Sequence, residues 1–188
     1  MKSIILISIG LALYSCFDAN YKSYKNSAKH QFIQKEYKAK CICNDHSYLE
    51  VITKYIEVPD TISRYGIYVL SQDIIVHYNN EIKVVDNPMN KVQNIQIGSE
   101  TLSVNSTLLV GAECLNNDKE VIYKIHGSDC IDPPHEFFGY LSIEGKWNNY
   151  YYGSQHEEYK KLGSNKKIIE KFGKKSNSLK GMINMLPK

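Results

Sequence analysis

The sequence predicts a mainly β fold of the α+β class, with an antiparallel β body and short helices at its C-terminal end. Short runs rich in Val, Ile, Thr and Tyr follow one another along the chain, and turn signals separate them. Tyr occurs fifteen times against five Phe and one Trp, and Tyr favours strands while keeping a polar end for the surface. Evenly spaced short strands of this kind favour an antiparallel arrangement.

The expected strands are residues 48–58, 66–70, 73–78, 81–85, 92–97, 101–104, 107–114, 120–125, 137–143 and 147–152. Turn signals stand between them, among them Asn79-Asn80, Asp86-Asn87-Pro88, Gly98-Ser99, Gly127-Ser128 and Glu144-Gly145. Residues 17–40 have no regular apolar face and are predicted to be a tether, with a frayed helix around 32–37.

Two helices are predicted near the end of the chain. The first covers residues 159–172, and Ser178 could cap the second, which ends before Pro187. Four apolar residues would share one face of the second helix: Leu179, Met182, Ile183 and Leu186. Basic amphipathic helices of this kind could lie on a membrane or pack on their own domain.

The N-terminus has the features of an export signal. Lys2 precedes an apolar run at residues 4–13, and Ser15 stands directly before Cys16. The run is too short to span a bilayer, which needs roughly 20 residues. The Cys after a small residue resembles the lipobox of bacterial lipoproteins. That resemblance implies cleavage before Cys16 and a thioether-linked lipid on its sulfur. A signal peptide cut elsewhere, which would release a soluble exported protein, is the alternative.

Charge is segregated along the chain. Residues 17–40 carry six Lys and two acidic residues, residues 41–159 carry seven basic and seventeen acidic residues, and residues 160–188 carry nine Lys and one Glu. The division predicts four parts: a signal peptide at 1–15, a lipidated basic tether at 16–40, an acidic β-rich domain at 41–159 and a basic helical segment at 160–188.

An acidic body restricts the classes of partner. Nucleic acid is excluded for the body, because phosphate contacts need Lys and Arg there. A cationic protein would be attracted to it, and its encounter would be accelerated. The basic ends would be drawn to anionic lipid headgroups beside the anchor.

Four cysteines remain besides Cys16: Cys41, Cys43, Cys114 and Cys130. In an exported chain an even number predicts two disulfides. A bond between Cys41 and Cys43 would close a strained ring, so we expect cross-links from the 41/43 region to Cys114 and Cys130. A metal site built from Cys41, Cys43, His46 and His126 is the alternative, although its spacing matches no common zinc pattern.

Three segments align without gaps: residues 73–79, 118–124 and 147–153. Tyr78, Tyr123 and Tyr152 occupy the same column. Here the chain resembles the DKNYY family, a repeat of bacterial envelope lipoproteins, through Asp118, Lys119 and the later Asp132-Pro133. The departures are Glu120 where the motif has Asn, Trp147 where it has Asp, and uneven spacing between copies. The resemblance covers at most residues 66–153 and implies a β-rich repeat fold without an established activity.

Catalytic signals are weak, and we expect no enzyme, no cofactor and no metal. Cys130 with His126 or His135 could form a thiol nucleophile and its base, but disulfide pairing is the simpler role for this cysteine. Neighbouring acids such as Asp129 and Asp132 could serve a glycosidase, whose two carboxyl groups must face each other across a cleft. Sequence adjacency does not establish that geometry.

Aromatic residues near the end of the body are the predicted binding residues. At least one of three consecutive residues in a strand points away from the core, because side chains alternate between faces. Exposed Tyr and Trp side chains are good anchors for a protein or a glycan. The predicted anchors are Tyr140, Trp147, Tyr150, Tyr151 and Tyr152.

These observations predict a lipid-anchored envelope protein that faces the periplasm or the exterior. Its expected role is non-catalytic binding of a cationic protein, as an inhibitor or immunity protein. A structural subunit of an envelope complex and an envelope hydrolase are the two alternatives.

Overall fold

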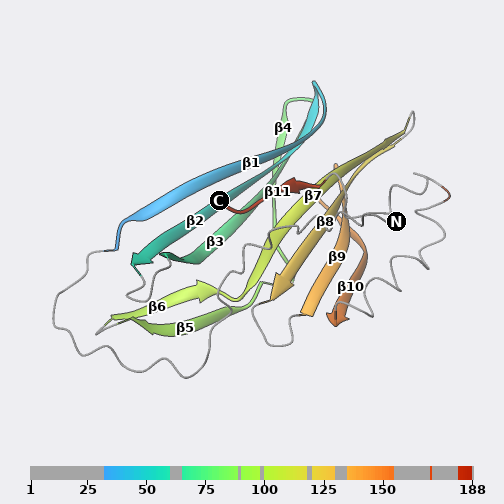
Figure 1. Ribbon diagram of the computed structural model, residues 1–188. Helices are drawn as coiled ribbons and strands as arrows, with labels where there is room; N and C mark the ends of the chain where they lie inside the picture. Colours follow the sequence, from blue (N-terminus) through green and yellow to red (C-terminus); the bar gives the residue numbers. More distant parts are fainter. Residues whose placement is uncertain are drawn as a thin grey trace, which may run out of the picture.

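The computed structural model is a sandwich of two antiparallel sheets with a two-stranded hairpin beside it (Figure 1). It describes residues 32–59, 65–88, 90–97, 100–117, 120–129, 135–154, 170 and 182–187, without the side chains of 59, 65 and 149–154. The strands are β1 (Gln34–Asn44), β2 (Ser47–Pro59), β3 (Tyr65–Tyr78), β4 (Glu81–Val85), β5 (Val92–Ile97), β6 (Glu100–Asn105), β7 (Thr107–Asn117), β8 (Glu120–Asp129), β9 (His135–Ser142), β10 (Trp147–Ser154) and β11 (Ile183–Asn184).

The strand orders are β1-β2-β3-β4 in one sheet, β10-β9-β8-β7-β11 in the second, and β5-β6 in the hairpin. The prediction of a mainly β, antiparallel body is confirmed. The predicted strands 66–70 and 73–78 form one continuous strand, β3, because Ser71 and Gln72 stay in the ladder opposite β2. Asn79 and Asn80 have φ values of 46° and 68°, as a tight two-residue hairpin turn requires.

Strand β1 begins at Gln34, inside the segment predicted to be a tether. Its buried or half-buried positions alternate with exposed Lys, Gln and Glu, and the inward side chains are Tyr37, Ala39 and Cys41. Only the alternation marks it as a strand, since two of these inward residues are small. The prediction of a frayed helix at 32–37 is therefore wrong, and the folded body starts before residue 41.

The predicted last helix is also wrong over its described part. Ile183 and Asn184 pair with Ala112 and Gly111 as strand β11, and the Met185 N–H donates to the Val110 carbonyl at 3.2 Å. Met185 and Leu186 are fully buried, whereas Ile183 is exposed. The backbone N–H and C=O groups of this segment bond to the edge of β7 instead of to one another, as they would in a helix. The predicted helix at 159–172 lies outside the described residues except for Glu170.

The main core lies between the two large sheets. Leu49, Val51 and Ile74 from the first sheet meet Leu109, Ile125 and Phe137 from the second, and all six are essentially inaccessible to solvent. Cys43 of β1 and Cys114 of β7 form a disulfide with a Cα–Cα distance of 5.4 Å. This bond links the sheets covalently across the core.

Gln72 forms a polar link between the sheets. Its amide Oε1 accepts from the Leu109 N–H at 2.7 Å, and its Nε2 donates to the Leu109 carbonyl at 3.1 Å. The ladder between β7 and β8 is irregular at this point, between Leu109 and Gly111. Ladder pairing is interrupted at this bulge, and the Gln72 amide supplies the donor and the acceptor that a neighbouring strand would otherwise provide to Leu109.

Strands β7, β8 and β9 of the second sheet are largely buried on both faces. Leu115, Ile122, Phe138 and Tyr140 form a separate apolar cluster on the face turned away from the first sheet. In contrast, the residues of β4 that alternate with the core positions, Ile82 and Val84, are exposed. The outward face of the first sheet therefore carries most of the accessible large apolar side chains of the sandwich among the described strands.

The three aligned segments occupy different places in the fold. The first ends β3 and enters the Asn79-Asn80 turn, the second begins β8, and the third lies in β10 at the edge of its sheet. Tyr78 is half-buried, whereas Tyr123 is fully buried opposite Cys114 and Leu141. The shared tyrosine column therefore does not correspond to one shared environment.

Candidate functional site

An exposed apolar surface lies on the outward face of the four-stranded sheet. The ladder places Ile42, Tyr48, His77 and Ile82 in one row across β1, β2, β3 and β4, with Glu50, Ile75 and Val84 in the next row. We name these seven residues the outer patch. Ile42, Ile82 and Val84 are 67%, 65% and 75% exposed.

The centre of the outer patch is polar and tightly packed. The rings of Tyr48 and His77 stack with centroids 4.1 Å apart, and the Lys40 ammonium lies 4.7 Å from the centroid of the Tyr48 ring. The Glu50 carboxylate lies between two nitrogen groups, 3.5 Å from Lys40 Nζ and 3.4 Å from His77 Nε2. Aromatic stacking holds the Tyr48 and His77 rings together on the sheet, and the exposed Lys40 side chain lies over the Tyr48 ring.

Such a surface is suited to holding another macromolecule. Isolated exposed aliphatic residues are common, but a contiguous group on one sheet face with a polar centre is typical of an interaction site. Rigid strands hold the side chains in register, so little conformational entropy is lost when a partner binds. The arrangement supplies affinity and orientation rather than a reacting group.

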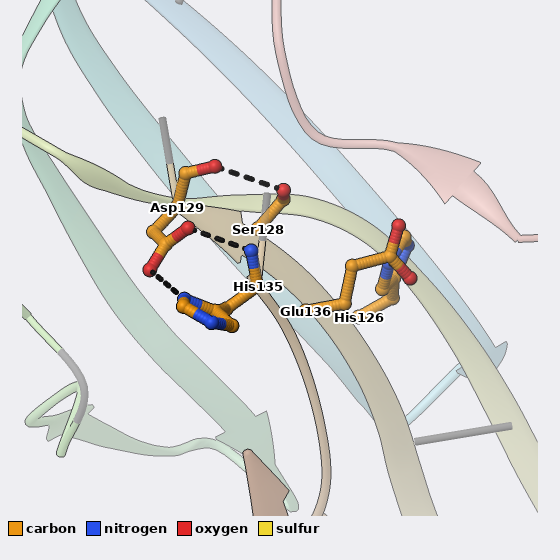
Figure 2. A network of polar contacts seen from close by, with 5 residues as sticks. All are labelled: His126, Ser128, Asp129, His135 and Glu136. Carbon is orange, nitrogen blue, oxygen red and sulfur yellow. Dashed lines mark hydrogen bonds and ion pairs between the residues drawn. The ribbon is translucent and has the colours of Figure 1, made fainter. Parts of the chain in front are cut away.

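A network of polar contacts joins the end of β8 to the start of β9 (Figure 2). Figure 2 shows His126 facing Glu136 across the two strands, and the distance between His126 Nε2 and Glu136 Oε2 is 3.0 Å. The buried Asp129 carboxylate accepts from the His135 N–H at 2.8 Å and lies 3.4 Å from His135 Nδ1. Both histidines thus face carboxylates at the ends of their strands, and this network fixes the strand ends.

The face of the second sheet turned away from the core carries a buried ion pair. Lys124 Nζ lies 3.2 Å from Glu113 Oε2 across β8 and β7, and the Lys124 side chain is fully inaccessible. Burial lowers the pKa of Lys124, and the Glu113 carboxylate opposes this shift. Charges this deeply buried are kept beside a group of opposite sign, so the pair has a structural role.

The predicted aromatic anchors do not form an exposed group among the described side chains. Tyr140 is fully buried in the cluster with Leu115, Ile122 and Phe138, so its prediction as a surface anchor is wrong. Trp147 is half-buried against the main core, and its indole N–H donates to the Asp86 carbonyl at 2.9 Å. The side chains of Tyr150, Tyr151 and Tyr152 lie outside the described ones.

The cysteines follow one part of the prediction. The expected cross-link from the 41/43 region to Cys114 is confirmed for Cys43, whereas Cys41 is a buried free thiol. The other expected cross-link involves Cys130, which like Cys16 lies outside the described residues.

The buried Cys41 thiol predicts a fall in stability at alkaline pH. Burial raises the pKa of Cys41 to about 11, and the Glu113 carboxylate adds to this shift against a backbone N–H from Cys114. The pKa of Cys41 is higher in the folded than in the unfolded protein, so the protonated thiol contributes to the free energy of unfolding. This contribution is complete below about pH 9 and is lost between about pH 9 and pH 11, by up to about 3 kcal/mol. The free energy of unfolding, measured by urea titration from pH 8 to 11, should fall more steeply with pH for the wild type than for Cys41→Ala. Parallel profiles for the two proteins would contradict the expectation.

Sequence reasoning missed the outer patch, although one signal of it was present. Strand β4 has apolar residues at both alternating positions, since Ile82 and Val84 stand beside the inward Val85. A strand that is apolar on both faces must either be covered twice or present one apolar face to a partner. That pattern, rather than the count of tyrosines, pointed to the accessible apolar surface.

Comparison with protein-family models, curated proteins and solved structures finds no match for this chain. Among the described residues, no group of three or more His, Cys, Asp or Glu side chains is placed to hold a metal ion. Within the same part of the chain, no helix is both long and apolar enough to cross a membrane.

Proposed function

We propose that this chain is a non-catalytic, lipid-anchored protein of the bacterial cell envelope that binds a protein partner through the outer patch. One row of the sheet carries the proposal: Ile42 and Ile82 are exposed at its ends, and Tyr48 and His77 are half-buried between them. Exposed aliphatic residues around a packed aromatic pair are the composition expected where binding energy concentrates.

The partner in this proposal is a basic protein, and binding inhibits it. Residues 41–159 carry seventeen acidic and seven basic residues, so the body attracts cationic surfaces from a distance. The outer patch then supplies the short-range contacts. An immunity protein or inhibitor that blocks a cationic toxin or wall hydrolase combines these two requirements, since it needs both rapid encounter and slow release.

The anchor rests on two resemblances: the lipobox at Cys16 and the DKNYY-like segments. In the proposal, the lipid at Cys16 and the basic residues that follow hold the chain at an anionic membrane surface. Because β1 begins at Gln34, the tether is shorter than the charge pattern suggested and ends within residues 17–33. The binding surface is then held facing the periplasm or the exterior.

A structural subunit of an envelope complex is the second candidate. The aliphatic residues of the outer patch favour it, because apolar contacts persist at salt concentrations that screen charged surfaces. The two candidates differ in the ionic-strength dependence of binding.

Affinity capture with patch variants tests the proposal. The oxidised chain from residue 17 onward would be immobilised through a C-terminal tag and exposed to envelope extracts and to culture fluid of competing strains. The columns would carry the wild type, the double variant Ile82→Asp/Val84→Asp and the control Val92→Asp, which changes an exposed residue of the separate hairpin.

A basic protein held by the wild type and the control but lost from the double variant supports the inhibitor. Release of that protein by high salt agrees with steered binding, whereas a salt-resistant subunit with the same patch dependence supports the structural role. Capture that is identical on all three columns argues against the outer patch as the binding surface.

A further inference from the structure

We propose that Glu50 determines the specificity of the outer patch by accepting a Lys or Arg side chain of the partner at the centre of the apolar surface. This inference rests on the proposed function and names the chemistry that the surface recognises.

Glu50 occupies an unusual position for a carboxylate. It lies in the middle of the sheet on β2, with Lys40 beside it on β1 and Ile75 beside it on β3. Its side chain is only 14% exposed, and Val84 continues its row to the edge of the sheet. A carboxylate with so little access to water depends on donors from the protein or from a partner.

The donors now beside Glu50 are not in close contact with it. Lys40 Nζ and His77 Nε2 lie 3.5 Å and 3.4 Å from the carboxylate oxygens, whereas charge-assisted hydrogen bonds are typically about 2.7–2.9 Å long. The buried His77 Nε2 makes no hydrogen bond. Lys40 is 48% exposed and also covers the Tyr48 ring, so it can move aside without being left unsolvated. A partner cation can therefore approach Glu50 more closely than either neighbour does.

The surroundings of Glu50 would strengthen such a contact. Ile42, Ile82 and Val84 stand exposed around the polar centre, and a partner that covers them excludes water from the ion pair. Removing water raises the strength of a close charge pair. The stacked rings of Tyr48 and His77 stand beside the carboxylate, whose two oxygens match the planar fork of a guanidinium group better than a single ammonium group.

The test selects ligands without assuming a partner. A phage-displayed library of random dodecapeptides would be selected on the oxidised chain from residue 17 onward, and the affinities of the enriched peptides would be measured on four proteins. These are the wild type, Glu50→Gln, Ile82→Asp and Glu57→Gln. The last is a matched control, because Glu57 lies on the same strand, pairs with Lys35 at 2.6 Å and loses the same charge.

We expect the enriched peptides to contain Arg or Lys flanked by apolar residues. They should bind Glu57→Gln as they bind the wild type, and bind Glu50→Gln at least tenfold more weakly. Replacing the peptide's Arg by the neutral isostere citrulline should cost the same factor on the wild type and nothing further on Glu50→Gln. The citrulline measurement on the wild type leaves the protein unchanged, so it holds even where Glu50→Gln affects folding.

Two other binding results would overturn the role of Glu50, and they differ in what they imply for the outer patch. Peptides that bind Glu50→Gln as tightly as the wild type but fail on Ile82→Asp would overturn the role of Glu50 and leave the outer patch as the binding surface. Peptides that bind all four proteins equally would overturn both this inference and the proposed use of the patch.

Discussion

Replacing Gly127 by alanine is expected to prevent the second sheet from packing, with a loss of at least about 3 kcal/mol in the free energy of unfolding. Gly127 lies opposite Phe137 in the β8–β9 ladder, and a Cβ atom added there would stand 1.9 Å from Cε1 of the Phe137 ring. That ring is fully buried in the main core, so it has no free space into which to move. Circular dichroism with urea titration measures the loss, together with the yield of soluble protein.

Two further variants make the Gly127 prediction specific. Gly66→Ala is the control, because its added Cβ would meet the Tyr68 ring at 3.2 Å, a half-buried side chain that can give way. The double variant Gly127→Ala/Phe137→Leu should recover part of the lost stability, since the shorter side chain vacates the contested space. Full stability of Gly127→Ala alone would show that the ring does not cover this glycine.

Removing the disulfide should have the next largest effect. Cys43 and Cys114 are 71 residues apart in sequence, and closing a loop of this length lowers the entropy of the unfolded chain. The double variant Cys43→Ala/Cys114→Ala should therefore lose about 4 kcal/mol, which corresponds to a fall of about 10–20 °C in melting temperature. Differential scanning calorimetry of the oxidised proteins makes the comparison.

The free thiol provides the control for the disulfide. Cys41→Ala removes a cysteine from the same strand but breaks no covalent bond, so its melting temperature should fall by much less. Reduction of the wild type with dithiothreitol should reproduce the melting temperature of the double variant. A double variant that melts within two or three degrees of the oxidised wild type would show that this bond does not hold the sheets together.

Most strands could be predicted from the sequence because each has a hydrophobic run and a turn signal of its own. Strands β4 and β5 have the predicted bounds, and the Asn79-Asn80 turn forms where two residues tolerant of positive φ occur together. Local sequence was sufficient to predict these strands because the hydrophobic pattern and the turn residues indicate the same strand ends.

The misinterpreted segments depend on tertiary contacts. The inward side of β1 includes small residues, and β11 is a strand only because β7 offers it an unpaired edge. The sequence predicts Tyr140 at the surface because tyrosine has a polar end, yet β9 is buried on both faces and Tyr140 is enclosed there. The outer patch is defined by cross-strand register, which no single strand reveals.

The Gln72 link has a consequence for how this protein can vary and be modified. It joins β3 to the start of β7, and the 37 residues of sequence separation between Gln72 and Leu109 include the whole β5–β6 hairpin. The hairpin is closed at its own base by the Ser106 N–H, which donates to the Lys91 carbonyl at 2.8 Å. The sandwich is therefore aligned without help from the hairpin tip. A label, an epitope or a longer loop inserted between β5 and β6 should leave the outer patch intact, which makes the tip a suitable attachment point for following the protein in living cells.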